Sequence, residues 1–184
     1  MKKLFANAIL LAVIFLSCNS KPKPFDISKH YIGALTDSTQ IKDLKTIFGN
    51  DSLVDFNSGK EFEGVSNKIE VYEKGGKKLL VLTPGQFLDS TSVITNVQII
   101  DQRFKTDKGI STQSSFKDIN TNYTIKRIDN LINAIAITVN EINASFIIDK
   151  EELPANLRFD RNIKFEATHI PDNAKLKYFF INWE

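Results

Sequence analysis

The chain has 184 residues, with 24 Lys and Arg against 22 Asp and Glu, and it contains one cysteine. This length suits one domain or two small fused repeats that bury a true hydrophobic core. The near balance of charge excludes a general nucleic-acid-binding role, which needs a strongly basic surface, and a single cysteine excludes a disulfide within the chain.

The first segment has the layout of a signal peptide. Two lysines precede an apolar run from Leu4 to Leu16, which is too short to span a bilayer as a stable helix. The run ends at Phe15-Leu16-Ser17-Cys18, which resembles the bacterial lipoprotein lipobox. In that family the matching cysteine receives acyl chains such as palmitate, and the signal is removed before it. We therefore expect residues 1–17 to be a lipoprotein signal peptide and Cys18 to be lipidated.

Residues 18–30 are expected to form a lipidated tether. Lys21-Pro22-Lys23-Pro24 favours an extended chain that cannot start a helix. The tether lacks the acidic cluster that resembles the surface-export signal of Bacteroidota lipoproteins, and Asn19 differs from the aspartate that retains many lipoproteins in the inner membrane. These features predict a lipid anchor at the periplasmic face of the outer membrane. Loss of the leader would leave 22 basic and 22 acidic residues.

The stretch from Thr36 to Gly49 predicts a helix, with Asp37 as its N-cap and Gly49 as a left-handed stop. One face of this helix carries its apolar residues, Ile41, Leu44 and Phe48.

Four strands are predicted after this helix. In the second, Ile69 and Val71 alternate with charged residues, which indicates a sheet with one wet face. Gly75-Gly76 joins the second and third as a hairpin turn, rather than as a phosphate loop, because strand follows where that loop would need a helix. The four expected strands are Ser52–Phe56, Lys68–Tyr72, Lys78–Leu82 and Val93–Ile100.

The pattern then begins again. Residues 116–123 repeat the order of residues 41–48, with an apolar residue, Lys-Asp, an apolar residue, threonine and an aromatic at a constant offset. Further strands are expected around Ile135–Val139, Ser145–Ile148 and Lys175–Trp183. The sequence predicts an α+β fold of two tandem repeats, each a short helix packed on an antiparallel β-meander. The repeats would cover residues 31–105 and 106–184; the alternative is a chance match between short apolar patterns.

The first half of the chain resembles the β-lactamase-inhibitor-protein-like fold. The resemblance rests on a glycine with threonine or serine before a short amphipathic helix, on the Phe48-Gly49 ending of that helix and on the meander that follows it. That superfamily includes the small lipoprotein subunit of the β-barrel assembly machinery. The resemblance is good over Ile32 to Leu82 and weaker over Gly109 to Ile148, where Thr124 replaces the terminal glycine. It implies protein binding by the sheet or its loops, without shared catalytic residues. The whole chain also resembles the small lipoproteins common in Bacteroidota.

Motifs that carry catalysis or bind metals are weak in this chain. His30 and His169 have no companion at ligand spacing, and no Gly-x-Ser-x-Gly elbow occurs, so no catalytic, metal or cofactor residue is predicted. Asp118-Ile119-Asn120-Thr121-Asn122 resembles a calcium loop, but Tyr123 stands where that loop needs glycine, and a helix is the better interpretation.

The chain closes on an aromatic strand. Tyr178 and Phe180 lie on one of its faces, and Phe179, Ile181 and Trp183 lie on the other. One face should be core. The other is either covered by a helix, which is the favoured interpretation, or a partner surface, for which Tyr178, Phe179 and Trp183 are the candidate residues.

Two functions follow from these observations. The first is a non-enzymatic, lipid-anchored envelope protein that binds another protein as a scaffold, inhibitor or immunity factor. The alternative is an envelope hydrolase acting on carbohydrate or peptide, because any two of the 22 acidic residues can converge in space.

Overall fold

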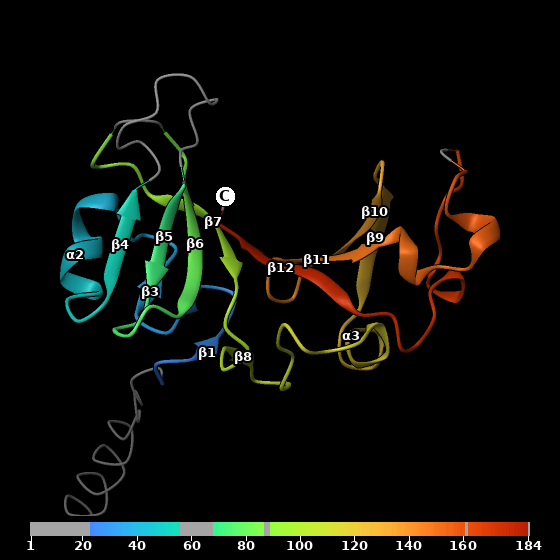
Figure 1. Ribbon diagram of the computed structural model, residues 1–184, viewed down its shortest axis with the longest axis horizontal. Helices are drawn as coiled ribbons and strands as arrows, with labels where there is room; N and C mark the ends of the chain where they lie inside the picture. Colours follow the sequence, from blue (N-terminus) through green and yellow to red (C-terminus); the bar gives the residue numbers. More distant parts are fainter. Residues whose placement is uncertain (1–22, 56–67, 87–88, 161, 184) are drawn as a thin grey trace, which may run out of the picture.

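The computed structural model describes residues 23–55, 68–86, 89–160 and 162–183, so the expected signal peptide and Cys18 lie outside the described residues. The chain has a mixed α+β fold dominated by antiparallel strands (Figure 1). Its strands are β1 (Asp26–Ile27), β2 (Tyr31–Ile32), β3 (Leu35–Thr36), β4 (Ser52–Asp55), β5 (Ile69–Tyr72), β6 (Lys78–Pro84), β7 (Ile94–Ile99), β8 (Lys105–Thr106), β9 (Ile125–Asn130), β10 (Ala134–Val139), β11 (Ala144–Asp149) and β12 (Leu176–Asn182).

Eight of these strands form one sheet in the order β4-β5-β6-β7-β12-β11-β10-β9. The junction is the antiparallel pair β7 and β12, in which Ile99 lies opposite Phe179 and Val97 opposite Ile181. β7 is the last strand of the first half and β12 is the last strand of the second half, so their pairing joins the two halves into one continuous sheet.

One face of this sheet is the core. A row of paired apolar residues crosses it, and because side chains alternate along a strand, the neighbouring residues face the other way. Phe146 and Phe179 meet at the centre of the core face with ring centroids 4.7 Å apart. The members of the row, all buried, are Val71, Leu80, Ile99, Phe179, Phe146 and Ile137.

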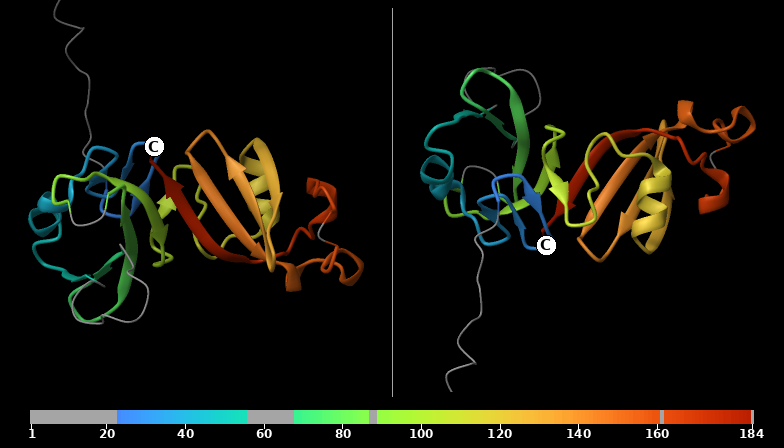
Figure 2. Two further views of the ribbon diagram at one scale, coloured as in Figure 1. Left: turned by 90° about the horizontal axis from the view of Figure 1, so that it is seen from above. Right: turned by 90° about the horizontal axis from the view of Figure 1, so that it is seen from below.

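Two short helical segments precede the two halves of the sheet. The first consists of a 3-10 turn, η2 (Ile41–Asp43), that continues into α2 (Leu44–Ile47), and the second is α3 (Phe116–Asn122). Both views in Figure 2 place α3 alongside β9, β10 and β11. Three further 3-10 turns lie between β11 and β12: η3 (Lys150–Glu152), η4 (Ala155–Leu157) and η5 (Ala167–His169). No helix among the described residues is long and apolar enough to cross a membrane.

The same hydrogen bonds hold the start of each helical segment. The Ile41 N–H donates to the Ser92 carbonyl at 3.1 Å, and the Phe116 N–H donates to the Ala174 carbonyl at 2.9 Å. An isolated bridge joins Gln40 to Val93, and another joins Ser115 to Lys175. Each segment is therefore tied to the chain just before the last strand of its half.

The predicted first helix was too long. Asp37 does not cap it, because the helix begins at Ile41 and the Asp37 carboxylate lies 2.7 Å from Nδ1 of His30. Gly49 is not in the left-handed region, so the helix ends without the predicted left-handed stop. By contrast, Gly75 and Gly76 have φ of 114° and 90°, which a hairpin between β5 and β6 requires. The hairpin interpretation is confirmed.

The predicted tether and the predicted boundary between the halves also need correction. Asp26–Ile27 form β1, which pairs with β2 and lies parallel to β8, so the folded body starts before residue 30. A boundary between residues 105 and 106 would cut through β8. The Trp183 indole N–H donates to the Lys29 carbonyl at 2.9 Å, which fastens the end of the chain to its first turn.

The prediction of one wet sheet face fails in the first half, because Glu70 and Val81 are buried on the face opposite the core row. The sequence also missed β9. Its apolar residues Ile125 and Ile128 are three apart, which breaks the alternation, and the register shift between Thr138 and Val139 lets them pair with Val139 and Ile137.

Candidate functional site

The face opposite the core row carries the candidate site. Across its centre runs a second row of paired residues, from Glu70 in β5 to Arg127 in β9. Only the two ends of this stretch are charged, and most of the uncharged members are half-exposed. The uncharged members, in order across the sheet, are Val81, Gln98, Phe180, Ser145 and Thr138. An uncharged centre between charged margins is the composition of a protein interface.

Two aromatic rings lie at the middle of this face. Tyr178 and Phe180 point to the same side of β12, with ring centroids 6.0 Å apart. Tyr178 is 42% exposed, and the Lys177 ammonium lies 5.9 Å from its ring centroid. Large rings with few rotatable bonds contribute much of the binding energy in protein interfaces.

An amide and hydroxyl ladder lies beside the rings and links the two halves. The Asn96 side chain donates to Oδ1 of Asn182 at 2.8 Å, and Nδ2 of Asn182 donates to Oγ of Ser145 at 3.0 Å. These bonds cross from β7 through β12 to β11, so they hold the central strands in register. The ladder therefore gives the rings a rigid base.

A hollow of about 270 Å³ opens next to the rings, where β7 and β12 part. Its walls include Gln98 and Tyr178 from the two strands and Gln113 from the loop before α3. This volume suits one inserted side chain rather than a large cofactor.

Charged pairs border the uncharged centre. In the first half, Glu70 accepts hydrogen bonds from Lys78 and Tyr72. Burial alone would raise the pKa of Glu70, but these hydrogen bonds more than offset it and lower the pKa below its ordinary value. In the second half, Nε of Arg127 lies 2.6 Å from Asp129. Both charged margins are thus locally paired, and neither leaves a bare charge at the edge of the patch.

Of the three residues considered for a partner surface, the structure leaves one exposed and buries two. Tyr178 is exposed, but Phe179 is fully buried against Phe146, and Trp183 is 4% exposed. Phe179 and Trp183 are therefore core residues, and their assignment to the partner surface is corrected. Phe180 takes their place, and the alternation of the strand already put it on the face of Tyr178. Nothing in the sequence pointed to Gln98 or Asn96.

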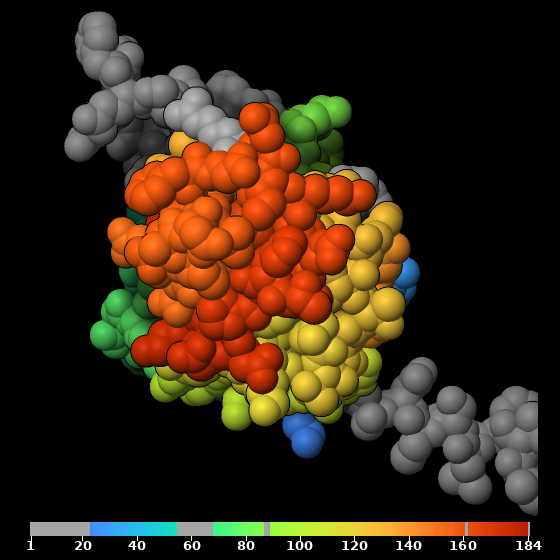
Figure 3. Space-filling view, turned by 90° about the vertical axis from the view of Figure 1, so that its right-hand side faces the viewer, coloured from blue at the N-terminus to red at the C-terminus, as the bar shows by residue number. Residues whose placement is uncertain are grey.

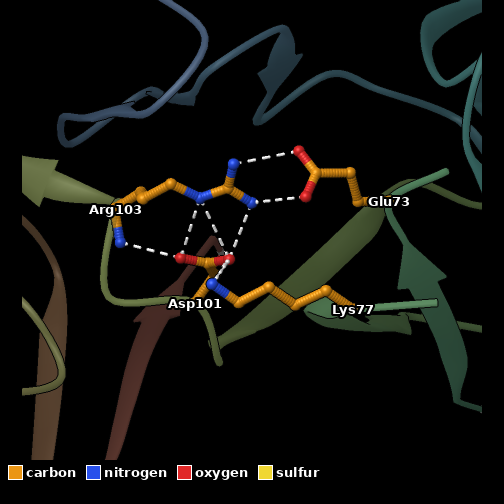
Figure 4. A network of polar contacts seen from close by, with 4 residues as sticks. All are labelled: Glu73, Lys77, Asp101 and Arg103. Atoms are coloured by element: carbon orange, nitrogen blue, oxygen red, sulfur yellow. Dashed lines mark hydrogen bonds and ion pairs between the residues drawn. The ribbon is translucent and has the colours of Figure 1, made fainter. Parts of the chain in front are cut away.

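A second polar cluster joins the β5–β6 turn to the chain after β7 (Figure 4). Arg103 reaches both oxygens of Glu73 at 2.9 and 2.8 Å and also Oδ2 of Asp101 at 2.8 Å. Lys77 lies 2.9 Å from the fully buried Asp101 side chain. The Arg103 guanidinium stacks over the Phe25 ring at 4.4 Å, so the cluster also holds the first residues of the body.

The same cluster has little capacity for acid catalysis. Burial would raise the pKa of Asp101, but hydrogen bonds from Arg103 and Lys77 reverse this and hold the pKa well below its usual range. The Arg103 hydrogen bonds lower the pKa of Glu73 as well. A general acid needs a raised pKa, so this carboxylate pair does not fit the glycosidase pattern.

The two histidines have local partners. Nδ1 of His30 pairs with Asp37, and Nδ1 of His169 accepts the Glu166 backbone N–H at 3.1 Å. No group of three or more His, Cys, Asp or Glu among the described residues could hold a metal ion. Asp118 lies in α3, so the helix interpretation of residues 118–122 is confirmed over the calcium loop.

No protein-family model matches the chain, and no curated protein sequence matches it. Among solved structures, the crystal structure of the uncharacterized protein yfeY from Escherichia coli is similar, with a TM-score of 0.54 and 15% sequence identity. The similarity covers 85% of this chain and 99% of that chain. At this identity the likeness shows the fold alone, and the function has to be argued from the residues of this chain.

Proposed function

We propose that this chain is a lipid-anchored envelope protein that binds another protein through the open face of its eight-stranded sheet. The observation that carries the proposal is the uncharged row at the sheet centre, with Tyr178 and Phe180 beside a hollow that fits one side chain. A scaffold, an inhibitor and an immunity factor would all use such a surface. The partner is taken to be a protein rather than a nucleic acid, because the near balance of basic and acidic residues gives the chain no strongly basic surface for phosphates.

The anchor in this proposal is a lipid on Cys18, at the periplasmic face of the outer membrane. Two or three acyl chains, each contributing about 0.8 kcal/mol per buried methylene, hold a protein firmly where one chain is marginal. Intact mass spectrometry of the membrane-extracted protein tests it. We expect a chain that starts at residue 18 and carries the mass of its acyl chains, and an unmodified chain cut elsewhere would refute the anchor.

We further infer that the two halves are tandem copies of one helix-and-meander unit, as in the β-lactamase-inhibitor-protein-like fold. The order α2-β4-β5-β6-β7 is matched by α3-β9-β10-β11-β12. Support also comes from hydrogen bonds at a constant offset of 75 residues. The Phe48 N–H donates to the Leu44 carbonyl and the Tyr123 N–H to the Ile119 carbonyl, both at 2.9 Å. Each copy would supply four strands to the shared binding face.

The binding face is tested by placing a photo-crosslinking residue at Gln98 in the full-length, membrane-attached chain. We expect one stoichiometric partner to be captured, and a probe at the exposed Lys45 on α2 serves as the matched control. Replacing Tyr178 and Phe180 together by alanine should reduce capture at least tenfold, because aromatic anchors commonly contribute about 2 kcal/mol or more.

The identity of the partner separates the roles. A hydrolase or toxin whose action is released when this chain is absent would identify an inhibitor or immunity factor, and barrel-assembly components would identify a scaffold. Equal capture from Gln98 and Lys45, with turnover of an envelope carbohydrate or peptide by the purified chain, would overturn the proposal in favour of the hydrolase alternative.

A further inference from the structure

We propose that a hollow at the β9 end of the sheet binds a carboxylate attached to an apolar group. The site goes beyond the protein-binding face and can be tested without any partner. It lies between the β9–β10 turn and the segment that follows β11, at the end of the molecule that Figure 3 faces, where residues 150–170 are orange to red. Its volume is about 670 Å³.

The walls come from three elements that hydrogen bonds hold together. The β9–β10 turn contributes Ile132 and Asn133, and the Lys150 backbone N–H donates to the Asn133 carbonyl at 3.0 Å. The segment after β11 contributes Arg158, and β12 contributes Lys177. A backbone hydrogen bond thus joins the β9–β10 turn to the start of the segment after β11, on either side of the hollow.

Lys150 is the central observation. The residue is only 5% exposed, yet its ammonium group has a single hydrogen-bond acceptor among the described residues, the Ile132 carbonyl at 3.3 Å. An ammonium group offers three donors, and burying its charge without an opposite charge is costly. The adjacent Asp149 does not supply that charge, because it already pairs with Lys177 at 2.6 Å. An anion in the hollow would complete the environment of Lys150.

Arg158 adds a second donor group on the same wall. Its Nε donates to the Leu153 carbonyl at 2.7 Å, which fixes the side chain, while its two terminal nitrogens have no partner among the described residues. A planar guanidinium with free terminal N–H groups matches the two oxygens of a carboxylate.

The charge balance of the hollow selects the class of anion. Three cations line it, together with the carboxylates of Asp149 and Glu151, which leaves one net positive charge. A singly charged carboxylate neutralises the site, whereas a doubly charged phosphate would meet the two acidic side chains with surplus negative charge.

The rim is apolar on two sides. Phe159 is 88% exposed and Ile132 is 80% exposed, and both line the hollow. Covering such side chains with an apolar group is favourable at about 25 cal/mol per Å². The ligand that fits is therefore a carboxylate next to an apolar chain, either a fatty carboxylate or the terminal residue of a peptide.

The test measures how well the full chain distinguishes an acid from its amide. Hexanoate and N-acetyl-leucine represent the two sources, and hexanamide and N-acetyl-leucinamide are their uncharged matches, all added in NMR titrations of the detergent-solubilised protein. We expect at least one acid to bind about tenfold more tightly than its amide, equivalent to about 1.4 kcal/mol. The acid that binds identifies the source.

Variants locate the effect. Lys150→Met keeps an unbranched side chain one atom shorter without the ammonium group and should abolish the preference for the acid, while Lys45→Met, at an exposed lysine on α2, should retain it. Arg158→Gln changes a half-exposed position and serves as the second variant if Lys150→Met fails to fold. It should lower the preference for the acid over the amide at least threefold. Phe159→Ser should weaken acid and amide equally.

Three results would overturn the site. These are equal affinity of the wild-type chain for acid and amide, an acid preference that survives in folded Lys150→Met or is undiminished in Arg158→Gln, and tighter binding of hexyl phosphate than of hexanoate. None of them bears on capture of a protein at Gln98, so the two proposals fail separately.

Discussion

The two helical segments carry nearly the same apolar pattern and differ in how well they form. In the second, Phe116, Ile119 and Tyr123 are all buried, and the segment is a regular helix of seven residues. In the first, only Leu44 is buried, and the segment is a 3-10 turn followed by a single α-helical turn. The same pattern therefore yields different helices, because short helices draw most of their stability from tertiary packing.

The N-terminus of the second helical segment is also better capped than that of the first. The Ser115 N–H donates to Asp118 at 2.7 Å, and Oγ of Ser115 accepts the Asp118 N–H in return. In the first segment the Gln40 N–H reaches Asp43 only at 3.4 Å. The short serine side chain is the better cap, so local sequence and packing both favour the second helix.

The largest expected effect is the loss of stability when a buried residue of the second helical segment is truncated, compared with the matching residue of the first. Phe116→Ala should lower the free energy of unfolding by about 4 kcal/mol, because its ring is fully buried, while Ile41→Ala at the matching, half-buried position should cost about 1 kcal/mol. Urea denaturation measures both, with the exposed Lys42→Ala as a control expected within about 0.5 kcal/mol of wild type. A larger loss from Ile41→Ala would show that the first helix is the better packed.

The charged cluster around Asp101 belongs to the first half, and no matching cluster occurs among the described residues of the second. Folding lowers the pKa of Asp101, so its ionised form stabilises the fold above the unfolded pKa of about 3.9, and that contribution is lost as pH falls. Asp101→Asn should cost about 2 kcal/mol at pH 7 and less at pH 2. Thermal melts from pH 7 to pH 2 measure this.

The control for that series is Asp172→Asn. Asp172 is exposed and lies 3.8 Å from Lys117, so its removal should change stability little at any pH. Equal pH dependence in Asp101→Asn and in wild type would contradict the role of the cluster.

The smallest expected effect concerns the caps. Ser115→Ala removes the hydroxyl that accepts the Asp118 N–H and should cost about 1 kcal/mol. Gln40→Ala should cost less than about 0.5 kcal/mol. Urea titrations of the two variants side by side decide this, and equal losses would mean that the caps are equivalent despite their different geometry.

Much of the strand pattern could be predicted, because apolar and polar residues alternate along a strand that buries one face. Seven strands were placed to within two residues at each end, as with Val93–Ile100 against the observed Ile94–Ile99. The small strands β1, β2, β3 and β8 were missed, because two-residue strands are too short to show any period. The β9 strand was missed because its apolar residues Ile125 and Ile128 are three apart, which breaks the alternation.

The candidate face was predicted only in part, for a similar reason. Alternation placed Tyr178 and Phe180 together, but a strand with apolar residues on both faces does not reveal which face is covered. Lys150 gave no signal at all, since a lysine before two glutamates is typical of an exposed turn.

The sequence by itself determined the α+β class, the order of most strands and the hairpin at Gly75-Gly76, because each depends on residues close together in the chain. Only the tertiary structure decided that β7 pairs with β12, that Phe179 and Trp183 are core, and that Lys150 is buried beside Ile132. These outcomes depend on contacts between residues far apart in sequence, and burial is fixed by what packs against a side chain rather than by its neighbours in the chain.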